Sequence, residues 1–205
     1  GFYLLEHHNP ATMGTLNAAG KFQAAFFQSV TTRTAGFASI SQSGLTNGSK
    51  LLACMLMIVG GSPAGTAGGI KTTTVAVLLL TAISVLRGNK DTECYGRKIT
   101  FEIIRVAITI TLVTFVFWLF GVTVMTVIEP QQKVLDLMFE ATSAMATVGL
   151  TVDLTPVLSD ISHVVLMLMM YIGRIGPMTM ALIFSGHVDK KNQFRTLPEA
   201  KIMVG

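Results

Sequence analysis

The chain has 205 residues, of which 51% are hydrophobic and 13% are charged, and its mean hydropathy is +0.61. An ordinary soluble domain is about 25% charged, so this composition indicates a membrane protein and excludes a disordered, collagen-like or disulfide-stapled chain. The net charge of +4 does not indicate a nucleic-acid surface, because the basic residues flank apolar stretches and no aromatic residues alternate with them.

Two further expectations concern the first residue and the cysteines. The chain begins with Gly1 rather than Met, so we expect the sequence to be a piece of a longer protein. The two cysteines are too few for a disulfide framework. Cys54 lies in an apolar run and Cys94 in a charged loop, so we expect them not to pair.

The first predicted elements are a short helix and a broken span. Residues 22–30 are apolar but too few to cross a bilayer, which takes about 20 residues, so they suit a re-entrant or interfacial helix. Residues 51–86 are longer than one span but contain a run rich in glycine, residues 60–69. In a helix, glycine costs about 1 kcal/mol and proline about 3 kcal/mol relative to alanine. The region therefore predicts a helix, an unwound loop at membrane depth and a second helix.

The second half of the chain predicts the same kinds of element. Residues 103–128 form an uninterrupted apolar span, residues 134–146 form a second short stretch, and residues 161–185 form a last span that contains Arg174. The loop after residue 86 and the C-terminal tail hold most of the basic residues, so the positive-inside rule places both in the cytoplasm. Residues 1–50 and 129–160 are then external.

An internal repeat appears when the sequence is shifted on itself so that Gly36 meets Gly149. Thr34-Ala35-Gly36-Phe37 then aligns with Thr147-Val148-Gly149-Leu150, and Gly60 aligns with Gly173. Thr46 and Ser159, both good N-caps, align before apolar runs. Each unit comprises a short helix, a Thr-x-Gly run, a polar connector and a capped span, and such a repeat defines the fold.

The Thr-x-Gly runs suit an ion filter. Potassium filters use backbone carbonyls to replace the water shell of the ion, and glycine permits the backbone conformations that bring carbonyls together. A short helix aimed at the bilayer centre also places its partly negative C-terminus near a cation. The alternative is that Gly36 and Gly149 are ordinary turn glycines beside interfacial helices.

The glycine-rich run suits a movable constriction. It is not a phosphate loop, because Ile70 separates Gly69 from Lys71 where that motif needs Gly-Lys-Ser/Thr. Irregular backbone at membrane depth is tolerated where it lines a water-filled path. An intramembrane hydrolase using Ser62 and Lys71 is a disfavoured alternative, because no oxyanion or orienting partner can be named. Lys71 has structural alternatives too, namely snorkelling or pairing with a carboxylate.

Arg174 lies near the middle of the last predicted span. An arginine there costs about 2.5–3.5 kcal/mol on insertion scales, so it needs a partner or water. We expect it to hold the glycine-rich loop through backbone carbonyls and to oppose cation flow. A snorkelling arginine without function is the alternative.

Four motifs in order resemble the Trk/Ktr/HKT superfamily of potassium transporters, and the likeness covers essentially the whole chain. They are residues 27–37, residues 60–72, residues 146–150 and residues 171–177, and residues 197–205 are similar to the C-terminus of Ktr-type membrane subunits. The resemblance implies an all-α membrane protein with four helix–pore-loop–helix units, of which this chain holds the third and fourth. One departure concerns residues 38–39, where an asparagine is more usual, and it leaves fine selectivity open.

The resemblance also implies site residues and partners. The ion-binding filter falls on Thr34, Ala35, Gly36, Phe37, Thr147, Val148, Gly149 and Leu150. The gate falls on Gly60, Gly61, Ser62, Pro63, Ala64, Gly65, Thr66, Ala67, Gly68, Gly69, Lys71 and Arg174. Potassium is the transported ion, and no enzymatic activity or resident metal is implied. The implied partners are membrane lipid, a second copy of the full-length subunit, and a cytosolic RCK-type ring that binds ATP or ADP.

The expected organisation assigns residues 1–88 to the third unit, 89–102 to a cytoplasmic linker, 103–187 to the fourth unit and 188–205 to a cytoplasmic tail. The expected location is the cell membrane. The alternative function is a secondary transporter whose substrate site is the broken helix. Its repeats would usually be inverted, whereas the two units here have the same orientation.

Overall fold

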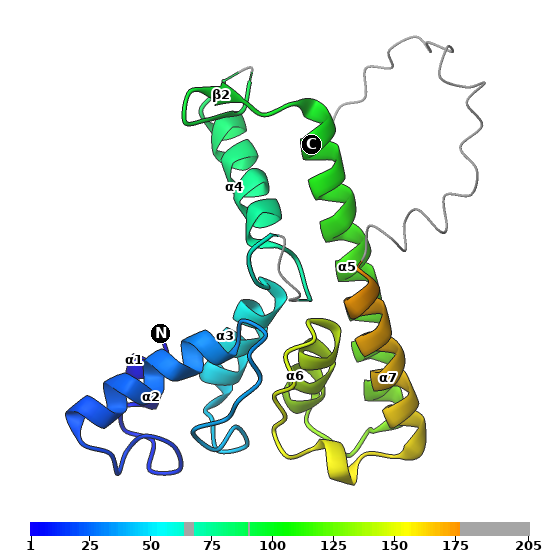
Figure 1. Ribbon diagram of the computed structural model, residues 1–205. Coiled ribbons are helices and arrows are strands. Elements are labelled where there is room, and N and C mark those ends of the chain that lie inside the picture. The colour runs from blue at the N-terminus through cyan, green and yellow to red at the C-terminus, as the bar shows by residue number, and fades with distance from the viewer. Residues whose placement is uncertain (64–67, 90, 177–205) are drawn as a thin grey trace.

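The computed structural model describes residues 1–63, 68–89 and 91–176, and Figure 1 shows how they are arranged. The elements in chain order are α1 (Phe2–Glu6), α2 (Ala18–Thr31), α3 (Asn47–Ile58), α4 (Thr72–Leu86), β1 (Glu93–Cys94), β2 (Arg97–Lys98), α5 (Phe101–Ile128), α6 (Val134–Met145), the 3-10 turn η1 (Thr155–Val157) and α7 (Asp160–Ile175). The two strands pair as a small antiparallel hairpin, and the other elements of the described residues are helices.

Among the helices that the structure describes, three begin at side-chain caps. Asn17 accepts a hydrogen bond from the backbone N–H of Gly20 at the start of α2. Thr46 and Ser159 cap α3 and α7 by accepting from the N–H groups of Ser49 and Ser162. Both of the caps that the repeat predicts therefore begin a helix.

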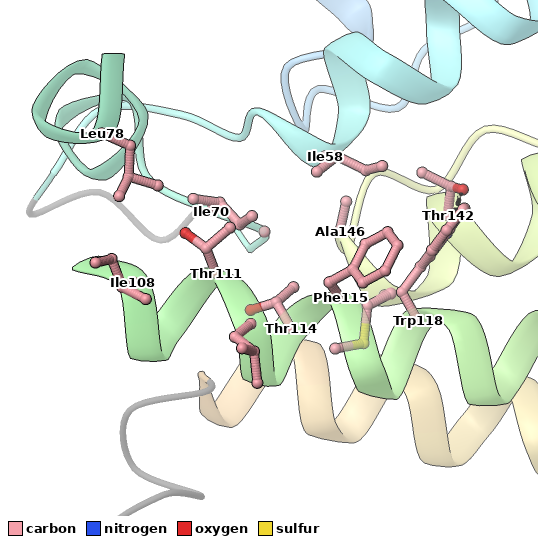
Figure 2. A pocket seen from close by; sticks show the side chains of 13 residues that line it. Ile58, Ile70, Leu78, Ile108, Thr111, Thr114, Phe115, Trp118, Thr142 and Ala146 are labelled. Atoms are coloured by element: carbon pink, nitrogen blue, oxygen red, sulfur yellow. Dashed lines mark hydrogen bonds between the residues drawn. The ribbon is translucent and has the colours of Figure 1, made fainter. Parts of the chain in front are cut away.

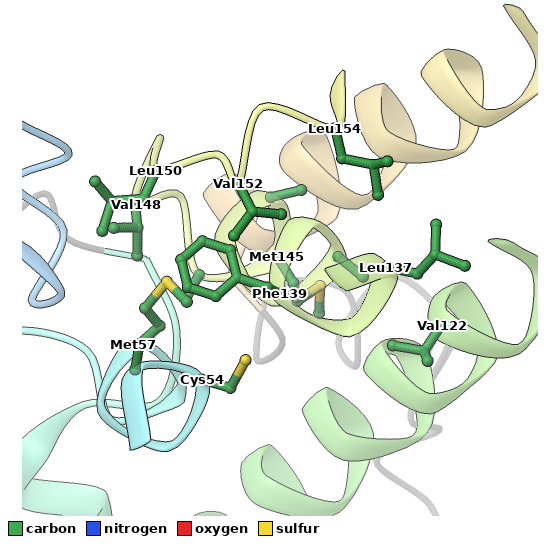
Figure 3. Close-up of a cluster of buried hydrophobic side chains, with 14 of the residues drawn as sticks. Cys54, Met57, Val122, Leu137, Phe139, Met145, Val148, Leu150, Val152 and Leu154 are labelled. Atoms are coloured by element: carbon green, nitrogen blue, oxygen red, sulfur yellow. The ribbon is translucent and has the colours of Figure 1, made fainter. Parts of the chain in front are cut away.

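The short helix α6 lies at the centre of the packing. It contacts α3, α5 and α7, and every residue from Phe139 to Met145 is buried. Figure 3 shows Phe139 among side chains from α3 and from the segment after α6, including Met57 and Val152. A helix that is buried on all sides reads as largely apolar throughout, which explains why residues 134–146 look like a truncated span.

The outer helix α5 presents much of its apolar surface outward. Phe115, Leu119 and Phe120 are exposed on it. Among the residues that the structure describes, α5 is the one helix whose length and composition suffice to cross a membrane, and α3 and α4 are shorter apolar helices. The region 51–86 therefore consists of two helices and a break, as expected from its glycines and proline.

The structure describes the last predicted span, the linker and the two cysteines as follows. α7 ends at Ile175, and the remainder of the predicted span, residues 177–185, lies outside the described residues, as does the tail 188–205. The linker 89–102 contains the β1–β2 hairpin, which the sequence pattern does not predict. Cys54 and Cys94 are both free thiols.

A carboxylate ties the first helix of the first half to the start of α3. Glu6, at the end of α1, accepts hydrogen bonds from the backbone N–H (2.9 Å) and hydroxyl (2.7 Å) of Thr46. Burial raises the pKa of this carboxyl, but hydrogen bonds from Ser49, Thr12 and Thr46 outweigh it and hold the pKa below its ordinary value.

The second half contains the same arrangement. Glu129 follows α5 and accepts from the N–H of Ser159 (2.8 Å) and the hydroxyl of Ser162 (2.9 Å). These hydrogen bonds from Ser159 and Ser162 lower the pKa of Glu129. In the internal repeat, Ser159 and Ser162 align with Thr46 and Ser49. Each half of the chain therefore has a carboxylate, Glu6 or Glu129, that binds the first turn of the following capped helix, and we call each of these arrangements a carboxylate clasp.

We expect the two clasps to make the fold less stable in acid. A carboxyl whose folded-state pKa lies below the ordinary value of 4.5 stabilises the fold above that pH, and the contribution is lost as the pH falls through the folded pKa. The unfolding temperature of the full-length protein should therefore decrease as the pH drops below about 4.5. The decrease should be less steep in the double variant Glu6→Gln/Glu129→Gln. Asp160→Asn, at an exposed carboxylate, is the control. If the unfolding temperature decreased equally steeply with pH in all three proteins, the two carboxylates would not stabilise the fold as proposed.

A buried ion pair joins the two halves of the chain. Lys50 of α3 and Asp136 of α6 lie 2.6 Å apart, with side chains 8% and 20% exposed. Removing one partner of a buried pair leaves an uncompensated charge. We expect Asp136→Asn to lower the free energy of unfolding by about 2–3 kcal/mol, less than for a fully buried pair.

The matched control is the pair of Lys98 and Asp91 in the linker, whose side chains are 62% and 47% exposed. An exposed pair contributes about 0–1 kcal/mol, so Asp91→Asn should change the unfolding free energy little. Chemical denaturation of the full-length protein measures both. A loss at Asp136 no larger than that at Asp91 would show that the Lys50 pair does not hold the halves together.

Candidate functional site

The two Thr-x-Gly runs adopt the same unusual backbone. Thr34 and Gly36 have φ of 65° and 77°, and Thr147 and Gly149 have φ of 55° and 90°. A left-handed conformation costs an L-residue about 1–2 kcal/mol, so the two threonines persist in it because their surroundings hold them there. The left-handed residues of one run are thus the repeat equivalents of those in the other.

Each run follows the C-terminus of a short helix after one or two residues. The N–H groups of Ala35 and Gly36 both donate to the carbonyl of Thr31, the last residue of α2 (3.2 and 3.3 Å). After α6, the N–H of Val148 donates to the carbonyl of Ser143 at 2.9 Å. The partly negative C-terminal ends of α2 and α6 are therefore next to the two runs.

The two runs also lie against each other. A Cβ atom added to Gly36 would overlap the carbonyl oxygen of Val148. The third and fourth filter segments predicted from the sequence are thus neighbours, although they come from opposite halves of the chain. Around Gly149 a Cβ would meet open space, so there only the backbone conformation requires glycine.

The glycine-rich run forms a loop that returns to its starting point. The N–H of Gly60 donates to the carbonyl of Ile70 (2.9 Å), and the N–H of Ile70 donates to the carbonyl of Ile58 (3.0 Å). Val59 and Ile70 form a parallel bridge at this base. Of the predicted gate residues, Ala64, Gly65, Thr66 and Ala67 lie outside the described residues.

The returning end of this loop, at Gly68, contacts the second Thr-x-Gly run. The N–H of Gly68 donates to the hydroxyl of Thr147 at 3.0 Å, and a Cβ on Gly68 would overlap Thr147 and the carbonyl of Ala146. The structure thus brings together a predicted gate residue and a predicted filter residue. Lys71 is half-buried and directly precedes α4.

Arg174 lies on the last turn of α7. It lines a cavity of about 570 Å³ together with the run from Thr147 to Thr151 and with Glu140 of α6. The neighbouring Gly173 packs so closely on α6 that a Cβ would overlap the carbonyl of Met145. Arg174 is therefore held on the same side of α6 as the second Thr-x-Gly run.

A second cavity, of about 430 Å³, lies between α4, α5 and the base of the glycine-rich loop (Figure 2). The hydroxyls of Thr111 and Thr114 are occupied by carbonyls of their own helix, and the indole N–H of Trp118 donates to Thr142 (2.8 Å). Its walls therefore offer an apolar surface. A cation needs oxygen ligands, so this cavity does not suit an ion path.

Sequence reasoning missed the buried polar side chains behind the runs. In the sequence Glu140 is one of several acidic residues in a segment predicted to be external, yet it is 4% exposed on α6. A carboxylate inside an apolar stretch is the signal that marks it. Among the described residues, no group of three or more His, Cys, Asp or Glu side chains is placed to hold a metal ion.

Comparison with known proteins identifies relatives along the whole chain. The family model TrkH, described as a cation transport protein, matches residues 2–195. The chain is 37% identical over 203 residues to the Ktr system potassium uptake protein B of Bacillus subtilis, covering 99% of this chain and 45% of that protein. It is 34% identical over 206 residues to the potassium/sodium uptake protein NtpJ of Enterococcus hirae, covering 99% and 46%.

A solved structure shows the same fold. The potassium transporter TrkH from Vibrio parahaemolyticus superimposes with a TM-score of 0.74 at 17% identity, covering 90% of this chain and 41% of that one. The chain spans about half the length of the curated relatives it matches.

Proposed function

Because this chain belongs to the TrkH family of cation transport proteins, we propose that it forms half of a potassium transporter of the cell membrane. In this proposal residues 1–88 and 103–187 are the third and fourth helix–pore-loop–helix units around one pore. The linker 89–102 and the tail 188–205 lie in the cytoplasm. The two units named here supply half of a ring whose other half comes from the remainder of the full-length protein.

The main support for this proposal is that the two Thr-x-Gly runs lie against each other. Each follows the C-terminus of a short helix, each has left-handed threonine and glycine, and Gly36 lies against the carbonyl of Val148. The backbone carbonyls of two adjoining runs could in this arrangement replace part of the hydration shell of potassium. We assign the filter to Thr34, Ala35, Gly36, Phe37, Thr147, Val148, Gly149 and Leu150.

The glycine-rich loop is proposed as the gate beside this filter. The hydrogen bond from Gly68 to Thr147 supports this position, and the small residues of 60–69 suit a segment that moves. Lys71 and Arg174 complete the proposed gate and place positive charge near the path, which opposes cation flow.

Partners and orientation rest on the family resemblance and on the basic residues. We propose that the full-length subunit forms a homodimer and binds a cytosolic RCK-type ring, and that any ATP or ADP is bound by that ring. The C-terminus is cytoplasmic in this proposal, as the positive-inside rule requires.

The experiment is potassium uptake by the full-length protein in cells that lack their own uptake systems. Growth and initial uptake rates at low potassium should be restored, and Ser62→Ala should restore them equally well because the proposed mechanism uses no nucleophile. Failure of the expressed, membrane-inserted protein to carry potassium would refute the proposal. Loss of function in Ser62→Ala alone would revive the hydrolase alternative.

A further inference from the structure

Each short helix carries one buried polar side chain that faces the connector after its Thr-x-Gly run. Gln28 of α2 is 0% exposed and Glu140 of α6 is 4% exposed. A buried polar group destabilises a fold unless it is hydrogen-bonded. The partners of these two side chains therefore indicate which part of the structure they hold.

Glu140 binds three donors from one short stretch of the chain. Its Oε1 accepts from the hydroxyl of Thr151 (2.5 Å) and the backbone N–H of Val152 (3.0 Å), and its Oε2 accepts from the hydroxyl of Thr155 (2.9 Å). The hydroxyls of Thr151 and Thr155 also contact each other at 3.1 Å. All three donors point at carboxyl oxygens, so one side chain fixes the connector that begins directly after Leu150.

In the first half of the chain, Gln28 binds the connector through a reciprocal pair of amide hydrogen bonds with Gln42. Its Nε2 donates to Oε1 of Gln42 (2.6 Å), and Nε2 of Gln42 donates back to Oε1 of Gln28 (3.1 Å) and to the carbonyl of Ile40 (2.9 Å). The same helix holds the run itself, because the hydroxyl of Thr31 donates to the carbonyl of Phe37 at 2.5 Å.

The two arrangements are related by the internal repeat but differ in chemistry. Gln42 and Thr155 are equivalent positions of the repeat, so the same point of each connector is attached to the short helix. One attachment uses a neutral amide pair and the other a carboxylate. A carboxylate that accepts three hydrogen bonds is the stronger of the two, because bonds to charged acceptors are roughly twice as strong as neutral ones.

We propose that Glu140 and Gln28 are positioning residues for the ion filter, an inference that rests on the proposed potassium transport. The left-handed threonines of the two runs persist only where the surrounding structure restrains them. The short helix restrains each run at its start through backbone hydrogen bonds, and Glu140 or Gln28 restrains it at its end through the connector. Ion preference depends on carbonyl positions that are held on both sides.

The experiment uses the full-length protein with Glu140→Ala, Glu140→Gln and the control Asp160→Asn, which removes an exposed carboxylate at the start of α7. Amide hydrogen exchange over residues 147–155 reports the restraint without requiring transport. The ratio of potassium to sodium uptake reports the filter. Glu140→Ala removes all three hydrogen bonds to the connector, and it should raise exchange at Val152 about tenfold and lower the uptake ratio about fivefold, because only part of the lost free energy acts on any one amide or on the filter.

Glu140→Gln keeps one acceptor oxygen and should recover part of both losses, while Asp160→Asn should change neither. Thr155→Val should cause little further loss in the Glu140→Ala background, because both changes remove the same bond. Gln28→Leu provides the parallel test in the other unit.

The outcomes separate this inference from the function that it assumes. A wild-type protein that carries no potassium would refute the proposed function, and hydrogen exchange would still test the restraint. Exchange unchanged in Glu140→Ala would overturn the restraint. Faster exchange with an unchanged uptake ratio in a transporting protein would overturn the role in ion preference and leave Glu140 a stability residue only.

Discussion

Replacing Gly36 by serine is expected to remove most of the preference for potassium over sodium in the full-length protein. Two effects act together at this position. The backbone has φ of 77°, and the new Cβ would overlap the carbonyl oxygen of Val148 in the neighbouring run. The left-handed conformation alone costs about 1–2 kcal/mol, roughly a five- to thirtyfold effect on an equilibrium, and the overlap adds to it by displacing a carbonyl that the ion would use.

Gly149→Ser separates the two effects. Its φ is 90°, but a Cβ there would meet nothing within 4 Å, so we expect only the smaller, conformational loss. Gly88→Ser is the control, because Gly88 has φ of 71° in equally open space but lies after α4, away from the filter. Uptake of potassium and sodium by reconstituted vesicles measures all three. Unchanged preference in Gly36→Ser, or an equal loss in Gly88→Ser, would exclude the filter assignment.

Shortening the glycine-rich loop is expected to raise potassium flux roughly tenfold, the effect of lowering a barrier by about 1.4 kcal/mol, while leaving ion preference intact. The ends of the loop pair directly, with the N–H of Gly60 2.9 Å from the carbonyl of Ile70. Residues 61–68 can therefore be replaced by two glycines without separating α3 from α4. The change removes the contact between Gly68 and Thr147 and leaves the filter runs themselves in place.

Arg174→Gln tests the charged part of the same gate and should raise flux in the same direction. Arg87→Gln is its control, because Arg87 lies at the C-terminal end of α4 beyond the loop. Potassium efflux from loaded vesicles is the measurement. Flux that falls or stays constant in both the shortened-loop protein and Arg174→Gln would show that this segment does not close the path.

Local chemistry made much of the fold predictable. The glycines and proline of 60–69 cannot continue a helix, so the break between α3 and α4 follows from composition. Thr46 and Ser159 predicted helix starts because their side chains satisfy N–H groups that the helix leaves open. The cap also explains why α3 begins at Asn47, ahead of the apolar run that starts at Leu51.

Contacts between distant residues could not be predicted in the same way. The ion pair of Lys50 and Asp136 joins the two halves of the chain, and the clasp of Glu129 reaches Ser159 across a whole helix. Periodicity reports which face of a helix is apolar, but not which neighbour a polar residue meets. Glu140 was recognisable as unusual from its apolar surroundings, whereas its three partners depend on the path of the chain after Leu150.

The ion pair of Lys50 and Asp136 also bears on how the protein enters the membrane during synthesis. α3 has 12 residues and α4 has 15, so neither alone is long enough to span a bilayer. When the ribosome has completed α4, the partner of Lys50 has not yet been made. The packing that buries Lys50 can therefore form only after α6 has been made, so the two halves of the chain complete their fold together.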